Sequence, residues 1–121
     1  MKLSLYDHLL RQMAFSRATF GPGPRVHGVL DHAEKEIEEI RRAHGSPEEW
    51  TDLVLLALDG LTRSLQYGKH RAYPEAAAEM ACRLISEKQG ANERRDWPDW
   101  RTADPNKAIE HVRGQGHEAA K

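Results

Sequence analysis

The sequence predicts an all-α fold, a bundle of four helices. Apolar residues recur at spacings of three and four in four separate stretches, which is the period of one helix face. Glycines and prolines separate these stretches, ending one helix and allowing the next to begin. A chain of 121 residues, 39% apolar and 31% charged, is long enough for one modest core but not for two. We therefore expect a single domain over residues 1–113 and a flexible tail over residues 114–121.

The charge balance and the apolar runs exclude several functional classes. A net charge of -1 gives no general attraction to a nucleic acid polymer or to an anionic membrane. The longest apolar run, Leu53–Leu58, is far shorter than the ~20 residues that a membrane span needs. We expect no signal peptide, because Met1–Leu10 has no apolar run of the required length, and the lone Cys82 cannot form a disulfide within the chain. We expect a cytoplasmic protein.

The first predicted helix runs from a Ser4 cap to about Ala18, and a loop rich in glycine and proline follows it. Pro22 and Pro24 lack backbone donors and therefore break the helix. Hydroxyl, guanidinium and aromatic side chains cluster at this break: Ser16, Arg17, Thr19, Phe20 and Arg25. Such a group could hold a phosphate and stack on a base. Composition alone slightly favours the alternative, an ordinary helix–helix turn with Phe20 in the core.

The second predicted helix, from about Arg25 to Ala43, carries a pair of acids. Its core-facing stripe consists of Val26, Val29, Leu30, Ala33, Ile37 and Ile40. At about 100° per residue, Glu36 and Glu39 lie together with His32 on one flank of that stripe. Like charges at this spacing repel each other, so the pair costs stability unless a positive group lies between its members.

The third predicted helix begins at Ser46-Pro47, ends near Tyr67 and carries a second pair of acids, Glu49 and Asp52. Glu49 also falls where a capping box places a glutamate, so capping of the helix could explain it. The helix is apolar nearly all round, which predicts burial in the interior or at a subunit interface. Within that surround, Asp59 can pair with Arg63 four residues later, whereas Asp52 has no such partner. A buried carboxylate needs a cation, a metal or a proton, so Asp52 indicates a metal site.

The two acidic pairs together predict a site for divalent cations. Two antiparallel helices with acids three residues apart can bring four carboxylates to one point: Glu36, Glu39, Glu49 and Asp52. Mg²⁺ suits such oxygen ligands better than Zn²⁺, and the seven histidines show no zinc-binding spacing. Because Mg²⁺ often shares its coordination shell with substrate phosphates, the cluster favours phosphoryl or nucleotidyl chemistry.

A fourth predicted helix opens at Tyr73-Pro74 and carries cationic and amide side chains near its end: Lys88, Asn92 and Arg95. These side chains could bind phosphates or a base edge, or they could be a solvated last turn that complements the helix dipole. The segment Trp97–Trp100 is expected to form an extended strap packed over the bundle rather than a ligand contact. A short helix is then predicted from Asp104-Pro105 to about Val112.

The two acidic pairs, followed at once by the apolar run Leu53–Leu58, resemble the MazG-like all-α nucleoside-triphosphate pyrophosphohydrolases, although the gap between the pairs is shorter than usual in that group. The resemblance is closest to a phage and bacterial branch, the dATP/dGTP diphosphohydrolases, and covers roughly Leu5 to Arg113. The segments that carry it are Tyr6–Leu9, Phe15–Arg25, Glu48–Trp50, Leu56–Gly60, Lys88, Asn92–Arg94 and Trp97–Arg101.

The resemblance implies hydrolysis of a purine dNTP between its α and β phosphates, with dGTP favoured and dATP as a second substrate. It implies that Glu36, Glu39, Glu49 and Asp52 hold two or three Mg²⁺ ions, for which Mn²⁺ can substitute. Lys88, Asn92 and Arg95 would neutralise the outer phosphates, and Ser16, Arg17 and Phe20 would meet the base or sugar. The family forms dimers or tetramers, and some phages use the dGMP product as the precursor of 2-aminoadenine DNA.

Two other functions are compatible with the same residues. In the first, the chain is a helical interaction module whose acids form a solvated face and whose tryptophans bind a partner. In the second, the fold binds a nucleotide as a regulator without turnover. Metal-dependent release of pyrophosphate from a dNTP separates the enzyme from both alternatives.

Overall fold

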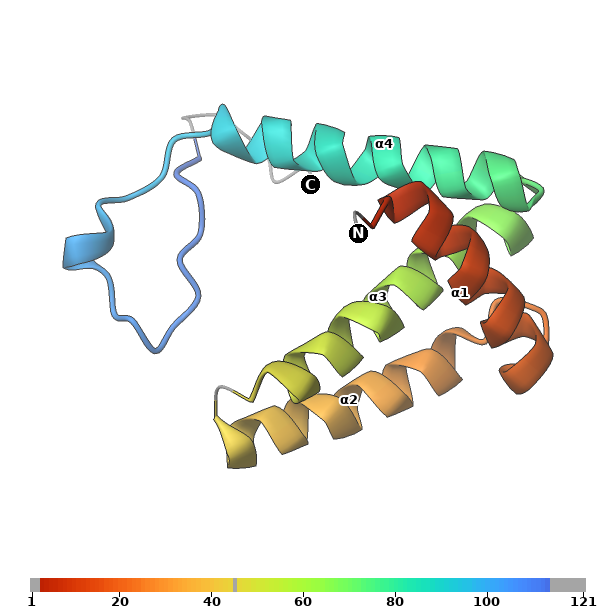
Figure 1. The fold of residues 1–121 in the computed structure, drawn as a ribbon. Helices are drawn as coiled ribbons and strands as arrows, with labels where there is room; N and C mark the ends of the chain where they lie inside the picture. Colours follow the sequence, from red (N-terminus) through yellow and green to blue (C-terminus); the bar gives the residue numbers. More distant parts are fainter. Residues whose placement is uncertain (1–2, 45, 114–121) are drawn as a thin grey trace. The chain divides into compact units, whose positions relative to one another are not determined.

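The computed structural model describes residues 3–44 and 46–113, and this part of the chain is helical without any strand. Four helices follow one another, α1 (Leu5–Phe20), α2 (Val26–Ala43), α3 (Pro47–Tyr67) and α4 (Pro74–Glu93), and a short 3₁₀ helix, η1 (Trp100–Thr102), comes after them (Figure 1). The all-α prediction and the four predicted helices are confirmed. Within the described residues, no helix is both long enough and apolar enough to cross a membrane.

The chain divides into two compact units, Met1–Leu84 and Ile85–Lys121, and the boundary falls inside α4. The first unit holds α1, α2, α3 and the first part of α4. The second unit holds the end of α4 and the segment with η1. A single domain over residues 1–113 therefore stays a prediction. The predicted tail over residues 114–121 lies outside the described residues.

The two ends of α1 follow from the sequence around them. Ser4 is the N-cap, and its Oγ accepts a hydrogen bond of 3.2 Å from the backbone N–H of Asp7, as predicted. The helix continues to Phe20, two residues beyond the expected end. It stops there because Gly21 and Gly23 adopt φ angles of +90° and +98°, which a residue with a side chain rarely adopts.

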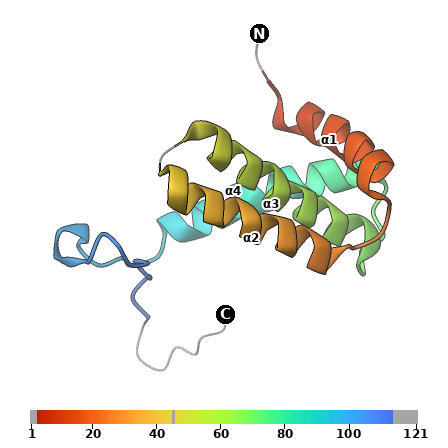
Figure 2. The same ribbon diagram turned by 90° about the horizontal axis from the view of Figure 1, so that it is seen from below.

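Helices α2 and α3 form an antiparallel hairpin and lie side by side in both views (Figures 1 and 2). Val29 of α2 is buried against Gly60 of α3, where an added Cβ would lie 3.7 Å from Val29 Cγ1. The hairpin joins the last turn of α2 to the first turn of α3. The acids of the two helices are therefore brought to the same end of the hairpin.

The apolar core of the first unit lies where α1, the end of α3 and the start of α4 meet. It consists of Leu9, Met13, Leu65, Ala77, Ala78 and Ala81. The three alanines are completely buried in this cluster. Packing at this end accounts for the burial of the C-terminal part of α3.

The N-terminal half of α3 is less buried than its apolar sequence predicts. Trp50 and Val54 are 52% and 54% exposed, and Asp52 is exposed as well. The hydrogen bonds that join α1 to α3 lie at Leu55 and further along α3, beginning with the bond from Gln12 Nε2 to the Leu55 carbonyl. The prediction that Asp52 lies in the interior is wrong for the single chain. Its burial at a subunit interface stays a prediction.

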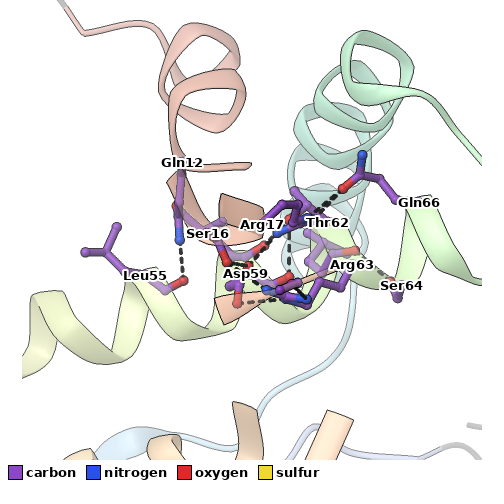
Figure 3. Close-up of polar contacts among 12 residues, drawn as sticks. Gln12, Ser16, Arg17, Leu55, Asp59, Thr62, Arg63, Ser64 and Gln66 are labelled. Carbon is purple, nitrogen blue, oxygen red and sulfur yellow. Dashed lines mark hydrogen bonds and ion pairs between the residues drawn. The ribbon is translucent and has the colours of Figure 1, made fainter. Parts of the chain in front are cut away.

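A charged network joins α1, α3 and the loop between α1 and α2 (Figure 3). Asp59 is 6% exposed and accepts hydrogen bonds from Ser16 Oγ at 2.7 Å and Arg17 Nη1 at 2.7 Å. Arg63, which is fully buried, donates from Nε to Asp59 Oδ2 at 3.0 Å, so the predicted pair is confirmed. Arg63 Nη1 also donates to the carbonyls of Gly21 at 3.0 Å and Gly23 at 2.7 Å. One carboxylate therefore anchors α1, and the arginine beside it fixes the loop.

The C-terminal segment folds back on itself within the second unit. The indole Nε1 of Trp97 donates to the Asn92 carbonyl at 2.7 Å, and the N–H of Val112 donates to the Asp96 carbonyl at 2.7 Å. The predicted helix from Asp104 to Val112 is wrong, because only one turn forms after Asp104 and Val112 bonds back to Asp96 instead. The only short helix in the described part of this segment is η1.

Replacing Asp59 should test how much the charged network contributes to stability. Asp59→Asn keeps the shape of the side chain but removes the charge that compensates Arg17 and Arg63. We expect the free energy of unfolding to fall by about 3–5 kcal/mol, the cost of breaking a buried pair. The measurement is urea denaturation followed by circular dichroism.

The matched control is Glu38→Gln, which removes an exposed pair with Arg41 at 3.4 Å and should cost less than about 1 kcal/mol. An Asp59→Asn variant that loses no more stability than this control would contradict the assigned role of the network.

Candidate functional site

The α2–α3 hairpin brings together all four acids that the sequence singled out. Glu36, Glu49 and Asp52 each offer one carboxylate oxygen, and these three atoms lie within 4.8 Å of one another. Glu39 adds the fourth carboxylate, which is close enough to Glu49 to raise the pKa of Glu49. Glu36 is buried, Glu49 half-buried, and Asp52 and Glu39 exposed. The cluster thus has a buried floor and an open side.

Two oxygens of this cluster lack a partner. Among the described residues, nothing donates a hydrogen bond to Glu36 Oε1 or to Glu49 Oε1, and both atoms are buried. Leaving a buried polar atom without a partner costs about 1–3 kcal/mol, and more when it is charged. The nearest cationic candidate is His32, whose Nε2 lies 3.6 Å from the other oxygen of Glu36. Unpartnered oxygens among converging carboxylates fit a hard divalent cation such as Mg²⁺.

The crowding of negative charge changes the proton affinity of Glu49. A hydrogen bond with Glu39, followed by burial and repulsion from Glu39, Glu36 and Asp52, raises the pKa of Glu49 to about 7. The capping-box alternative does not explain this residue. Ser46 makes no side-chain capping bond, and its Oγ donates instead to Glu48 Oε1 at 3.0 Å. Glu49 therefore belongs to the acidic cluster.

A hollow of about 290 Å³ extends from the acidic cluster toward the end of α1. Its lining residues are Phe15, Ser16, Phe20, His32, Glu36, Asp52, Leu55, Leu56 and Asp59. A second hollow of about 250 Å³ adjoins it and shares Phe20, His32, Leu56 and Asp59. Phe20 is 47% exposed, so the alternative that placed it in the core is wrong. The acids thus border a partly apolar space with an aromatic side chain in its wall.

The family comparison addresses the activity of this site. The sequence matches the model of the dATP/dGTP pyrophosphohydrolase family over residues 9–115, which is most of the chain. The chain belongs to the dATP/dGTP pyrophosphohydrolase family. It is therefore a hydrolase with a nucleotide substrate, as the resemblance implied. No curated protein and no solved structure matches the sequence significantly.

In this pyrophosphohydrolase, Ser16 and Arg17 lie beside the site but are tied into the charged network. Arg17 donates from Nε to Gln66 at 2.9 Å and from Nη2 to Thr62 at 3.1 Å, in addition to its bond with Asp59. All three of its side-chain nitrogens thus donate within the chain. Ser16 lines the larger hollow but is 3% exposed. Both residues support the wall of the site, and their contact with a substrate stays a prediction.

Lys88, Asn92 and Arg95 belong to the second unit of the pyrophosphohydrolase. Arg95 Nη1 donates to Asn92 Oδ1 at 3.0 Å, so the structure brings these two side chains together. Lys88 is exposed. Their proposed contact with the phosphates stays a prediction.

Two lining residues outside the predicted site set, Phe15 and Arg25, contact the Phe20 ring. Phe15 is 62% exposed and meets Phe20 edge to face, with ring centroids 6.3 Å apart. Arg25 lines the smaller hollow and lies over the Phe20 ring, with 5.8 Å between its Cζ and the ring centroid. The signal for Arg25 was its place in the cluster at the Gly-Pro loop. Phe15 gave a weaker signal, namely an aromatic residue on the polar side of α1.

The raised pKa of Glu49 predicts how the stability of the metal-free pyrophosphohydrolase depends on pH. Between the usual pKa of 4.5 and about 7, folded Glu49 holds a proton that the unfolded chain has lost. The free energy of unfolding therefore falls as pH rises through this window and levels off above it. The measurement is the thermal midpoint in EDTA at several pH values, compared with that of Glu49→Gln.

The Glu49→Gln variant cannot titrate at this position, so it should lose less of its thermal midpoint over the same pH range. The difference between the two proteins isolates the contribution of Glu49 from those of other groups. Identical pH profiles for the two proteins would contradict the raised pKa.

Proposed function

We propose that this chain hydrolyses purine deoxynucleoside triphosphates to the monophosphate and pyrophosphate in a reaction that requires Mg²⁺, with dGTP preferred over dATP. Membership of the dATP/dGTP pyrophosphohydrolase family supports the nucleotide substrate and the type of reaction. The geometry of the acidic cluster supports the proposed requirement for Mg²⁺. Three carboxylate oxygens lie within 4.8 Å of one another, and two buried oxygens have no partner among the described residues. The preference for dGTP rests on the resemblance to the phage and bacterial branch.

Four carboxylates would hold two or three Mg²⁺ ions, with Mn²⁺ as a substitute: Glu36, Glu39, Glu49 and Asp52. Bound Mg²⁺ would neutralise phosphate charge and lower the pKa of the water that attacks the α-phosphorus. Glu49 must give up its proton before it can act as a ligand, since its pKa is raised to about 7. Asp52 and Glu39 are the exposed members of the cluster, so the triphosphate would approach from their side.

The remaining site residues would position the nucleotide. Phe20 offers an aromatic face to the base, and Leu55 and Leu56 give the larger hollow an apolar wall that excludes water. Ser16 and Arg17 hold that wall in place through Asp59 and would meet the sugar or base at its edge. Lys88, Asn92 and Arg95 would neutralise the β and γ phosphates, either in the same subunit or across a subunit boundary.

The activity is tested by measuring pyrophosphate release from a panel of dNTPs with Mg²⁺ and with EDTA. We expect turnover of dGTP and dATP only when Mg²⁺ is present. Glu39→Gln and Asp52→Asn should each abolish activity, because loss of a ligand exceeds the about 10- to 100-fold cost of changes outside the first coordination shell. Circular dichroism should show that both variants keep their helical content.

The control for these two variants is Glu38→Gln, which neutralises the glutamate next to Glu39 and should keep wild-type turnover. Near-normal turnover by Asp52→Asn would contradict the metal assignment. Absence of metal-dependent turnover with every dNTP would contradict the proposed activity itself.

We also propose that the chain assembles as a homodimer or homotetramer through the outer face of the α2–α3 hairpin. Large apolar side chains are exposed there, at Val26, Leu30, Ile37, Trp50 and Val54. An apolar groove on the same two helices is lined by Val26, Leu30 and Gly60, among others. Exposed apolar surface of this extent on two adjoining helices is typical of an interface. Because the resembling family forms dimers or tetramers, we propose that the partner at this face is a second copy of the chain.

A charge placed on this face should disrupt the assembly. Val54→Glu introduces a carboxylate at a position that is 54% exposed in the single chain, so the monomer can tolerate it. We expect light scattering after size exclusion to show a dimer or tetramer for the wild type and a smaller species for the variant. An unchanged mass for Val54→Glu would contradict an interface at this position.

The setting that fits this activity is the cytoplasm of a bacterium or of a phage-infected host. There, dGMP released from dGTP could supply the synthesis of 2-aminoadenine DNA, as in the phages of the resembling branch. A dGTP preference in the dNTP panel is the first requirement of this role. A clear preference for dATP would contradict it.

A further inference from the structure

Arg25 lies in the smaller hollow and has no role in the function proposed above. Three features hold its side chain there. The residue has a φ angle of +44° directly before α2 begins, and its Cζ lies 5.8 Å from the Phe20 ring centroid. Its Nη2 occupies the space beside Gly28, where an added Cβ would lie only 2.6 Å away. The guanidinium is therefore folded back against the first turn of α2, beside Gly28, while the residue stays exposed to solvent.

The other charged side chains that line the smaller hollow have partners of opposite charge. Lys35 Nζ lies 3.0 Å from Asp31 Oδ2, Asp59 pairs with Arg17 and Arg63, and His32 Nε2 lies 3.6 Å from Glu36 Oε2. The lining therefore offers far less free positive charge than a triphosphate would need. A triphosphate would require an excess of positive charge, whereas a neutral base with polar edges would not. The hollow around Arg25 thus suits the base of a nucleotide better than its phosphates.

The distance along α2 agrees with this placement. The guanidinium lies beside Gly28, and Glu36 of the acidic cluster follows eight residues later, which is about 12 Å along a helix. A nucleotide whose phosphates lie at the acids would extend its base toward Phe20 and Arg25. The two hollows between them share four lining residues and so form adjoining spaces.

We propose that Arg25 reads the edge of the purine base and selects guanine over adenine. Guanine presents two acceptors side by side, O6 and N7, which match the paired donors of a guanidinium. Adenine presents an amino group in place of O6, and this donor would face another donor. Arg25 is thus a specificity-determining residue for the reaction. This inference rests on the proposed function, because it assumes a purine dNTP as substrate.

The experiment compares kcat/KM for dGTP and dATP in the wild type, Arg25→Met and Arg25→Lys. We expect Arg25→Met to lose about tenfold or more on dGTP, the worth of a bidentate pair, and to change on dATP by no more than about twofold. Arg25→Lys keeps the charge but lacks the planar pair of donors, so it should lose selectivity as well. Arg11→Met, which removes an exposed arginine of α1, is the matched control.

Modified substrates test the same contact without relying on the variants. The wild type should hydrolyse 7-deaza-dGTP, which lacks the N7 acceptor, more slowly than dGTP. It should hydrolyse dITP, which keeps O6 and N7, nearly as well as dGTP. In Arg25→Met the difference between dGTP and 7-deaza-dGTP should disappear.

Several results would overturn the proposal. Equal losses on dGTP and dATP would show that Arg25 binds the phosphates or only supports Phe20. Equal turnover of dGTP and 7-deaza-dGTP by the wild type would exclude the N7 contact even if the variants failed to fold. In both cases the proposed pyrophosphohydrolase activity would stand. Only the absence of turnover with every dNTP would remove that activity and this inference together.

Discussion

The buried carboxylate of Asp59 is the interaction on which the first unit depends. It accepts hydrogen bonds from Ser16, Arg17 and Arg63, and so joins α1 to α3. A charge at 6% exposure is costly unless it is paired, and here two guanidinium groups compensate it. Because Arg63 also binds the carbonyls of Gly21 and Gly23, the same network fixes the loop that leads from Phe20 to α2. The buried network of Asp59 thus holds in place the end of α1 and the loop after it, which line the candidate site.

Within the described chain, the carboxylates of the acidic cluster, unlike that of Asp59, are not compensated by arginine side chains. Its carboxylates converge without a compensating cation among the described residues, apart from His32 at 3.6 Å from Glu36. The raised pKa of Glu49 and the two unpartnered oxygens are two consequences of this crowding. Sites that bind metals and phosphates often give up stability in this way, because the ligand supplies the missing charge. The contrast between Asp59, which is fully paired, and Glu49, which is not, distinguishes a structural carboxylate from a candidate metal ligand.

Much of the fold and the core of the candidate site could be predicted from local patterns. The i, i+3 spacing of Glu36 and Glu39, and of Glu49 and Asp52, places each pair on one side of its helix. Ser46-Pro47 between the helices makes a hairpin, and a hairpin brings the two pairs together. The exposure of Trp50 and the turn after Asp104 were mispredicted. They depend on how far α1 extends along α3 and on the bond from Val112 to Asp96, which no local pattern encodes.

The sequence by itself determined the four helices, the acidic pairs on two of them and the pair of Asp59 with Arg63, because helix periodicity and four-residue spacing are local properties. The tertiary structure alone decided that Arg17 and Ser16 join that pair, since they lie more than forty residues away in the chain. It alone placed Phe20 against Arg25, in two adjoining hollows of which one reaches Glu36 and Asp52. Contacts between distant segments depend on which faces pack together, and packing is settled only when the whole chain folds.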